Sequence, residues 1–208
     1  YDDNIYLTDG NETDSFISST QVGAQYQSNI PGSGLELTAN GQVGYNAYTE
    51  DSGTNNFWNA LGDVSLKNEW MNIGDRFLYT SDPANSSLTD RAERIQNIGY
   101  VSFKTSSEKK FGVGFTADDV FDRYMKSKWS GLNRNRVNLG AQLYYNVSPK
   151  TNFFAEYNYS DISYEDNKAN ESVGNSVGLG VNGQIASKVT GTAKITYDMR
   201  DYDHSVAG

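Results

Sequence analysis

The sequence contains no cysteine, only three prolines and no long apolar run. The absence of cysteine excludes a disulfide scaffold, a thiolate metal site and a haem attached through Cys-x-x-Cys-His. No segment approaches the roughly 18 uncharged apolar residues of a transmembrane helix. Disorder does not explain the low mean hydropathy of -0.66, because disordered chains are rich in proline and poor in aromatic residues. Since 13% of the residues are aromatic, we expect an ordered chain that uses few apolar residues.

Turn signals recur along the chain at intervals of about 40 residues, in a sequence rich in asparagine, glycine and tyrosine. They fall at residues 31–34, 67–68, 106–109, 148–150 and 186–188. Longer and more acidic stretches lie between them, at 50–56, 81–93, 126–135 and 165–172. This spacing predicts a series of hairpins in which short turns alternate with longer loops.

Apolar and polar residues alternate in the segments between these connections. The pattern is clearest in residues 35–47, 111–117, 137–147, 177–185 and 189–200. It is less clear in 70–79, where Asp75 and Arg76 fall mid-strand, and 95–103 fits either register. We count ten or eleven strands, each long enough to cross a bilayer obliquely, which takes about 9 to 11 residues.

One apolar face and one polar face on every strand suit two architectures. A soluble sandwich buries its apolar face, whereas a membrane barrel turns that face to lipid and encloses the polar one. Strand length, unequal connections and tyrosines near strand ends favour an all-β, antiparallel, up-and-down transmembrane β-barrel, as a single domain over residues 1–208. A barrel in lipid must close, with an even strand count in bacterial single-chain examples. We therefore expect this chain to be an incomplete barrel, truncated at its C-terminal end.

Aromatic residues near the strand ends are candidates for the girdles that anchor a barrel at the headgroup level. Cross-strand packing is the alternative explanation for each of them. The candidates are Tyr26, Tyr45, Tyr48, Phe57, Trp58, Phe77, Tyr79, Phe121, Tyr145, Phe153, Tyr157, Tyr159 and Tyr197.

Three segments carry a resemblance to a known family. They are YDDNIYLT at 1–8, the loop YTSDPANSSLTDR at 79–91, and the alternating run from 176 to 202. Across essentially the whole chain the sequence resembles the beta-barrel porin 2 family of Gram-negative outer membranes. The resemblance implies an outer-membrane barrel. It also implies a link to exopolysaccharide, because members of that family are often associated with exopolysaccharide synthesis and export. It supplies no catalytic residues.

The net charge of -9 is concentrated in the longer loops. Their carboxylates are hard ligands for divalent cations, but no segment has a calcium-loop spacing, so solvated loops are expected and no metal site or cofactor is predicted. A sequence pI of about 4.6 without a basic stripe makes nucleic acid an unexpected partner.

Residue parity predicts which polar side chains face the lumen of the barrel. Charges of both signs there can pair to brace the wall or line a water-filled path. Bracing is expected on the last strand, where opposite signs share one face. The predicted lumen-lining residues are Glu36, Asn40, Gln42, Asp118, Arg136, Gln142, Glu156, Asn158, Lys194, Asp198 and Arg200.

The sequence offers few candidates for an enzymatic role. The candidates are Asp118-Asp119 on one strand and Asp203-His204-Ser205 near the end, where His204 is the single histidine. Adjacent strand residues point to opposite faces, and neither a Gly-x-Ser-x-Gly elbow nor a zinc signature is present. We expect no enzyme and assign no catalytic residue.

The sequence therefore predicts a porin-like barrel in the outer membrane of a Gram-negative bacterium. Its expected role is that of a conduit or secretion component for exopolysaccharide or small polar solutes. The expected partners are outer-membrane lipid and lipopolysaccharide, with polysaccharide, envelope proteins and a second copy of the chain as further candidates. The alternative is a non-conducting barrel that anchors a larger cell-surface assembly, and a soluble β-sandwich or adhesin ranks third.

Overall fold

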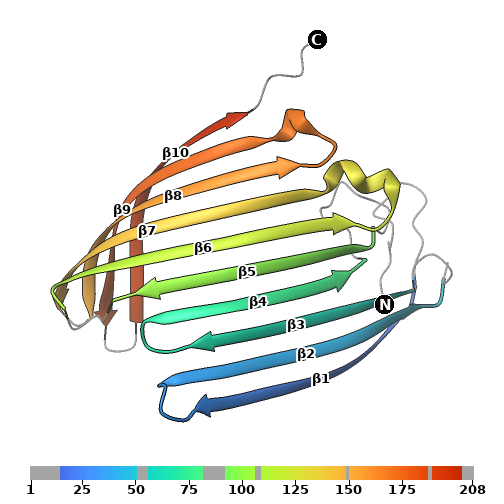
Figure 1. Cartoon of the computed structure of the whole chain (residues 1–208), viewed down its shortest axis with the longest axis horizontal. Helices are drawn as coiled ribbons and strands as arrows, with labels where there is room; N and C mark the ends of the chain where they lie inside the picture. Colours follow the sequence, from blue (N-terminus) through green and yellow to red (C-terminus); the bar gives the residue numbers. More distant parts are fainter. Residues whose placement is uncertain are drawn as a thin grey trace.

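The computed structural model describes residues 15–50, 56–81, 92–105, 109–148, 150–186 and 189–202. In these residues the chain forms one antiparallel sheet in which each strand pairs with the next, from β1 at one edge to β10 at the other (Figure 1). The strands are β1 (Ile17–Ile30), β2 (Leu35–Tyr48), β3 (Phe57–Lys67), β4 (Met71–Thr80), β5 (Arg94–Lys104), β6 (Phe111–Tyr124), β7 (Arg134–Ser148), β8 (Thr151–Tyr164), β9 (Ser172–Ala186) and β10 (Val189–Tyr202).

The connections alternate in length as the turn signals predict. The short connections follow β1, β3, β5, β7 and β9, and we call this side of the sheet the turn end. The longer ones follow β2, β4, β6 and β8, at the loop end, and two of them contain the short 3-10 helices η1 (Ser127–Leu132) and η2 (Lys168–Asn170). Gly32 and Gly34 in the first turn have positive φ angles of 76° and 68°, which glycine adopts without steric cost. In the described parts of the chain, no helix has the length and apolar character needed to span a membrane.

The predicted fold class is confirmed: the protein is all-β, antiparallel and up-and-down, with ten strands in one sheet. Among the described residues, β1 and β10 each have a single neighbouring strand, so the sheet is open. Such a curved, open meander is consistent with part of a barrel wall (Figure 1).

The stagger of the strands is close to that of a barrel wall. Cross-strand partners define one row that runs from Tyr26 on β1 to Asp201 on β10. Tyr26 lies nine positions from Ile17, the loop end of β1, whereas Asp201 lies one position from Tyr202. The row therefore moves eight residues closer to the loop end over the nine steps from β1 to β10. With about 3.3 Å per residue along a strand and about 4.8 Å between neighbouring strands, this shift corresponds to a strand tilt of about 32°. Closed barrels have tilts of about 35–45°.

The two faces of the sheet differ sharply in chemistry. We define the polar face as the even-numbered residues of β2 and of β4 to β10, with the odd-numbered residues of β1 and β3. The other residues form the apolar face. The ambiguous segment 95–103 is resolved by pairing with its neighbours, which places Ile95, Val101 and Phe103 on the apolar face.

Burial on the two faces is the reverse of that in a soluble protein. Every buried residue in the described strands lies on the polar face, among them Val120, Asp122, Tyr144 and Phe154. The apolar face is the exposed one, with side chains such as Val22, Leu143, Leu179 and Ile195 between 63% and 83% exposed. The polar face is therefore the crowded, inner side of the curved sheet.

The girdle prediction needs one correction. Tyr48 and Phe57 belong to the polar face, where their rings lie 6.4 Å apart and Phe57 is only 8% exposed. The other candidates lie on the apolar face, and Tyr45 packs on Trp58 with ring centroids 4.7 Å apart.

Candidate functional site

The central part of the polar face over β6 to β10 is a groove built from two neighbouring rows of cross-strand partners. The first row consists of Asp118, Asn138, Ser160, Gly174 and Arg200. The second row consists of Thr116, Gly140, Asn158, Ser176 and Asp198. Because each residue comes from a different strand, the register of the sheet fixes where the amide, hydroxyl, carboxylate and guanidinium groups lie.

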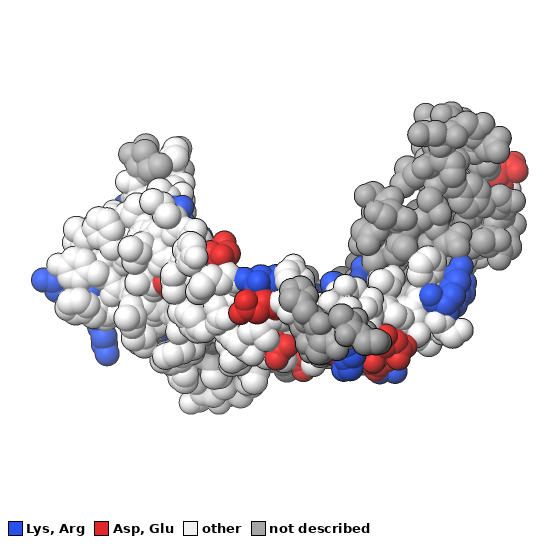
Figure 2. All heavy atoms as spheres, turned by 90° about the horizontal axis from the view of Figure 1, so that it is seen from above, with Lys and Arg blue, Asp and Glu red and all other residues white. Residues whose placement is uncertain are grey.

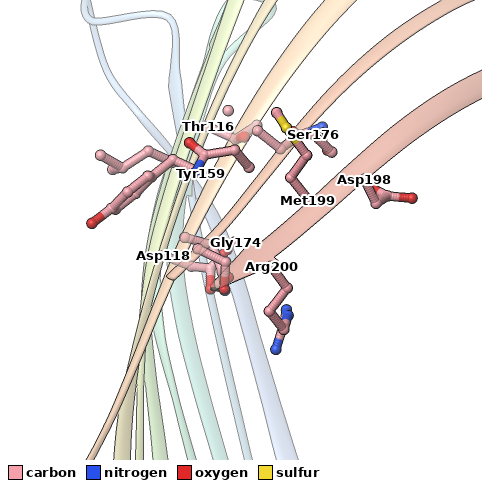
Figure 3. A pocket seen from close by; sticks show the side chains of 14 residues that line it. Thr116, Asp118, Tyr159, Gly174, Ser176, Asp198, Met199 and Arg200 are labelled. Carbon is pink, nitrogen blue, oxygen red and sulfur yellow. Dashed lines mark hydrogen bonds between the residues drawn. The ribbon is translucent and has the colours of Figure 1, made fainter. Parts of the chain in front are cut away.

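These two rows line a cavity of about 440 Å³. Gly174 and Arg200 are cross-strand partners, and Figure 3 shows Asp198 further along β10. An adjoining cavity of about 330 Å³ shares Thr116, Gly140 and Asn158 and continues towards the turn end. Together the two cavities form one polar groove, which we call the central groove.

Glycines lower the floor of the central groove. A side chain at Gly174 would lie 3.3 Å from Nη2 of Arg200, so the guanidinium group passes directly over this glycine. A side chain at Gly140 would meet the Thr116 hydroxyl and lie 3.0 Å from Oδ1 of Asn158. The glycines therefore allow long polar side chains from neighbouring strands to lie flat across the sheet.

Hydrogen bonds orient most of the polar groups in the groove. Asn138 donates to Asp118 over 2.6 Å, and Asn158 donates to the Ser176 hydroxyl over 3.3 Å. Glu156 accepts from Gln142 over 3.2 Å and from Lys194 over 2.7 Å. Since Glu156 lies on β8 and Lys194 on β10, this ion pair spans β9.

An aromatic side chain closes the turn end of the groove. The buried Tyr144 ring covers Gly114, where an added Cβ would lie 2.6 Å from the tyrosine hydroxyl. The ammonium of Lys104 lies 4.6 Å from the centre of the same ring, within the range of a cation–π interaction. Lys104 therefore brings a positive charge to this end of the groove.

A second polar cluster lies on the same face near the loop end. Asp122 is only 2% exposed and accepts hydrogen bonds from Arg134 Nε at 3.0 Å, Gln96 at 2.7 Å and Arg94 at 3.4 Å. A buried carboxylate between two guanidinium groups is satisfied electrostatically, and this cluster joins β5, β6 and β7.

All eleven residues predicted to line the lumen lie on the polar face. Asp118, Asn158, Asp198 and Arg200 line the larger cavity, and Gln142 and Glu156 line the smaller one. Lys194 reaches the groove through Glu156. Arg136 lies beside the groove on β7, and Glu36, Asn40 and Gln42 lie on β2, away from it. On β10, Lys194 pairs with Glu156 rather than with a residue of its own strand, and Arg200 donates to Ser172 over 3.5 Å.

Several groove residues were not singled out from the sequence. Asn138, Ser160 and Ser176 have the same parity as the predicted residues, and parity was the signal that could have included them. The Asp122 cluster could not be found in this way, because Arg94 and Arg134 come into contact with it only through the register of three strands.

The described residues contain no group of three or more metal-ligating side chains that could hold a metal ion. Asp118 and Asp119 project to opposite faces, so they do not form a carboxylate pair. The candidate Asp203-His204-Ser205 lies outside the described residues, as do most of the acidic loop 81–93 and the 1–8 segment.

The fold and the central groove define the structural class of the protein. It is a staggered, up-and-down β-sheet with an exposed apolar face and a polar, grooved inner face. Beyond this class, no protein-family model, curated protein or solved structure matches the chain.

Proposed function

We propose that this chain forms the wall of a porin-like β-barrel in the outer membrane of a Gram-negative bacterium. The observation that carries the proposal is the reversed burial of the two faces. In a soluble antiparallel sheet the apolar face is packed against a core, whereas a membrane barrel exposes it to lipid. Lipid and lipopolysaccharide are then the partners of the apolar face. The resemblance of the sequence to the beta-barrel porin 2 family supports the same placement, and membership of that family is part of the proposal.

The central groove supports a role in the passage of polar solutes. Asn138, Asn158, Ser160 and Ser176 offer amide and hydroxyl groups that can replace the water around a polyhydroxylated molecule. Gly140 and Gly174 allow such a molecule to approach the backbone closely. Small polar solutes and exopolysaccharide are therefore the proposed cargo, and the proposed role is passage and binding rather than catalysis.

A second candidate is a non-conducting barrel that anchors a cell-surface assembly. The observation in its favour is the set of ion pairs that run across the polar face. Lys194 and Glu156 join β10 to β8, and Asp122 joins Arg94 to Arg134. Such pairs brace a wall, and in a narrow barrel they also obstruct the lumen.

Planar-bilayer recording of the protein expressed from its complete gene separates these functions. A conduit is expected to give stable conductance steps that oligosaccharide reduces in a concentration-dependent way. Stable insertion into liposomes without conductance would establish the anchoring barrel instead. Failure to enter liposomes, with the protein monomeric in buffer without detergent, would refute both.

A matched pair of variants tests the groove itself. Asn158→Ala removes an amide from the groove, and loss of one or two hydrogen bonds is expected to weaken oligosaccharide block up to about tenfold. Gln25→Ala removes an amide from the polar face of β1, outside the groove, and should leave the block unchanged. Equal effects of the two substitutions would show that solute does not bind in the central groove.

A further inference from the structure

Asp75 on β4 is a charged residue in the middle of the apolar face. Its row partners are Val64 on β3 and Gly99 on β5, and the flanking apolar-face residues of its own strand are Ile73 and Phe77. Asp75 is exposed. If the apolar face contacts lipid, as the proposed function requires, an exposed carboxylate here lacks the solvent that a charge needs.

Aromatic residues place Asp75 at mid-depth. At the turn end, Trp70 packs edge-on against Phe103 with ring centroids 5.7 Å apart, and Phe103 is the cross-strand partner of Met71. At the loop end, the Tyr79 hydroxyl donates to Glu93 over 3.4 Å. Asp75 is four positions from Met71 and four from Tyr79. At about 3.3 Å per residue and the tilt of about 32°, these levels are about 22 Å apart, close to the apolar band of about 25 Å in outer-membrane barrels.

The side chain of Asn97 makes this a polar pair rather than an isolated charge. Asn97 on β5, also on the apolar face, donates its amide to Asp75 Oδ1 over 2.7 Å. The other carboxylate oxygen, Oδ2, lies beside Gly99, where an added Cβ would be 3.8 Å away. One oxygen is therefore bound within the chain, and the other faces a position with no side chain to cover it.

A short row of small residues lies next to this pair, between the exposed side chains of Val22, Val43 and Val64. Ala24, Gly41 and Gly62 are consecutive cross-strand partners on β1, β2 and β3, on the same face. A Cβ at Gly41 would meet nothing within 4 Å, and one at Gly62 would meet only Phe77 at 4.0 Å.

We infer that the surface formed by Asp75, Asn97, Gly99 and Gly62 is the contact between two copies of this chain in the membrane. All copies of a barrel share one orientation in the bilayer, so a two-fold axis must lie along the membrane normal. Rotation about that axis leaves every residue at its own depth in the bilayer. The patch of one copy therefore meets the same patch of the other copy at the same depth. Each copy brings one amide and one carboxylate, so the polar pairs of the two copies meet at the same depth instead of facing lipid. A different partner would need its own polar group at this depth.

Cysteine cross-linking tests the contact directly, because the sequence has no native cysteine. Gly99→Cys adds a thiol beside Asp75 without removing the polar pair. Leu143→Cys is the matched control, since Leu143 is 63% exposed on the apolar face of β7. With the protein expressed from its complete gene and inserted into liposomes, oxidation is expected to give a covalent dimer for Gly99→Cys and none for Leu143→Cys. Equal cross-linking of both variants, or of neither, would overturn the inference.

A charge substitution gives a second readout that does not depend on a cysteine. Asp75→Leu should weaken the dimer at least tenfold, measured by sedimentation velocity in detergent, and Asp75→Asn should preserve it. The control is Asp201→Leu, an exposed apolar-face carboxylate on β10, one position from the loop end, which should leave the measured mass unchanged. An inserted barrel that stays monomeric, or one whose mass does not respond to Asp75→Leu, refutes the contact alone. Failure of the unsubstituted protein to insert refutes the proposed function instead.

Discussion

At the scale of the residue, Asp122 shows how the polar face holds a buried charge. Its carboxylate is 2% exposed and accepts hydrogen bonds from Arg94, Gln96 and Arg134. Asp122→Ala would leave two guanidinium groups without their shared partner. We expect the free energy of unfolding to fall by about 3–5 kcal/mol, measured by urea titration of the detergent-solubilised protein.

Asp119→Ala is the control for this substitution. Asp119 is three positions away on the same strand, but it is exposed and lies on the other face. Its substitution should change the free energy of unfolding by no more than about 0.5 kcal/mol. Similar losses for the two variants would mean that the Asp122 cluster contributes little beyond an exposed charge.

At the scale of the element, the glycines of β9 determine how closely side chains of β8 and β10 approach one another. Phe154, 6% exposed, lies across Gly180, where an added Cβ would be 2.7 Å from its Cε1 atom and 2.9 Å from the Ala193 carbonyl oxygen. Aromatic cover of a strand glycine is a known stabilising device in sheets. Gly180→Ala should displace Phe154 and destabilise the protein by about 1–3 kcal/mol in the same titration.

Gly183→Ala, three residues further along β9, serves as the matched variant. A Cβ there would make ordinary contacts of 3.5 Å with Thr151, so little destabilisation is expected. If both substitutions lower the free energy of unfolding equally, the effect would reflect glycine replacement in a strand in general. The packing of Phe154 over Gly180 would then not be its cause.

For the strands, the sequence predicts which face a residue lies on but not which residues are in contact across strands. Period-two alternation predicts the strands and the face of all eleven candidate residues, because side-chain direction in a strand depends on parity alone. Cross-strand contacts depend on register as well, so the pairing of Lys194 with Glu156 could not be read from either strand. Nearness to a strand end does not identify a girdle residue by itself, because parity places Tyr48 and Phe57 on the inner face.

At the scale of the whole molecule, charge is divided unequally between the two faces. The chain carries a net charge of -9, yet the described strand residues of the polar face hold eight basic and six acidic side chains, a net charge of +2. The basic residues are Lys67, Arg76, Arg94, Lys104, Arg134, Arg136, Lys194 and Arg200, and the acidic ones are Glu36, Asp63, Asp118, Asp122, Glu156 and Asp198. Figure 2 shows acidic and basic side chains next to one another across the middle of the molecule.

This excess of positive charge predicts that a pore with this inner face prefers anions. In a tenfold KCl gradient, the reversal potential across a planar bilayer should have the sign of anion selectivity, because fixed charges along a pore favour counter-ions. Arg200→Gln removes a charge that lines the central groove and should move the reversal potential towards zero. Arg123→Gln is the control: Arg123 lies on the apolar face, paired with Glu165, and its loss should leave the potential unchanged. Cation selectivity in the unsubstituted protein, or equal shifts in the two variants, would show that the polar face does not line the path of the ions.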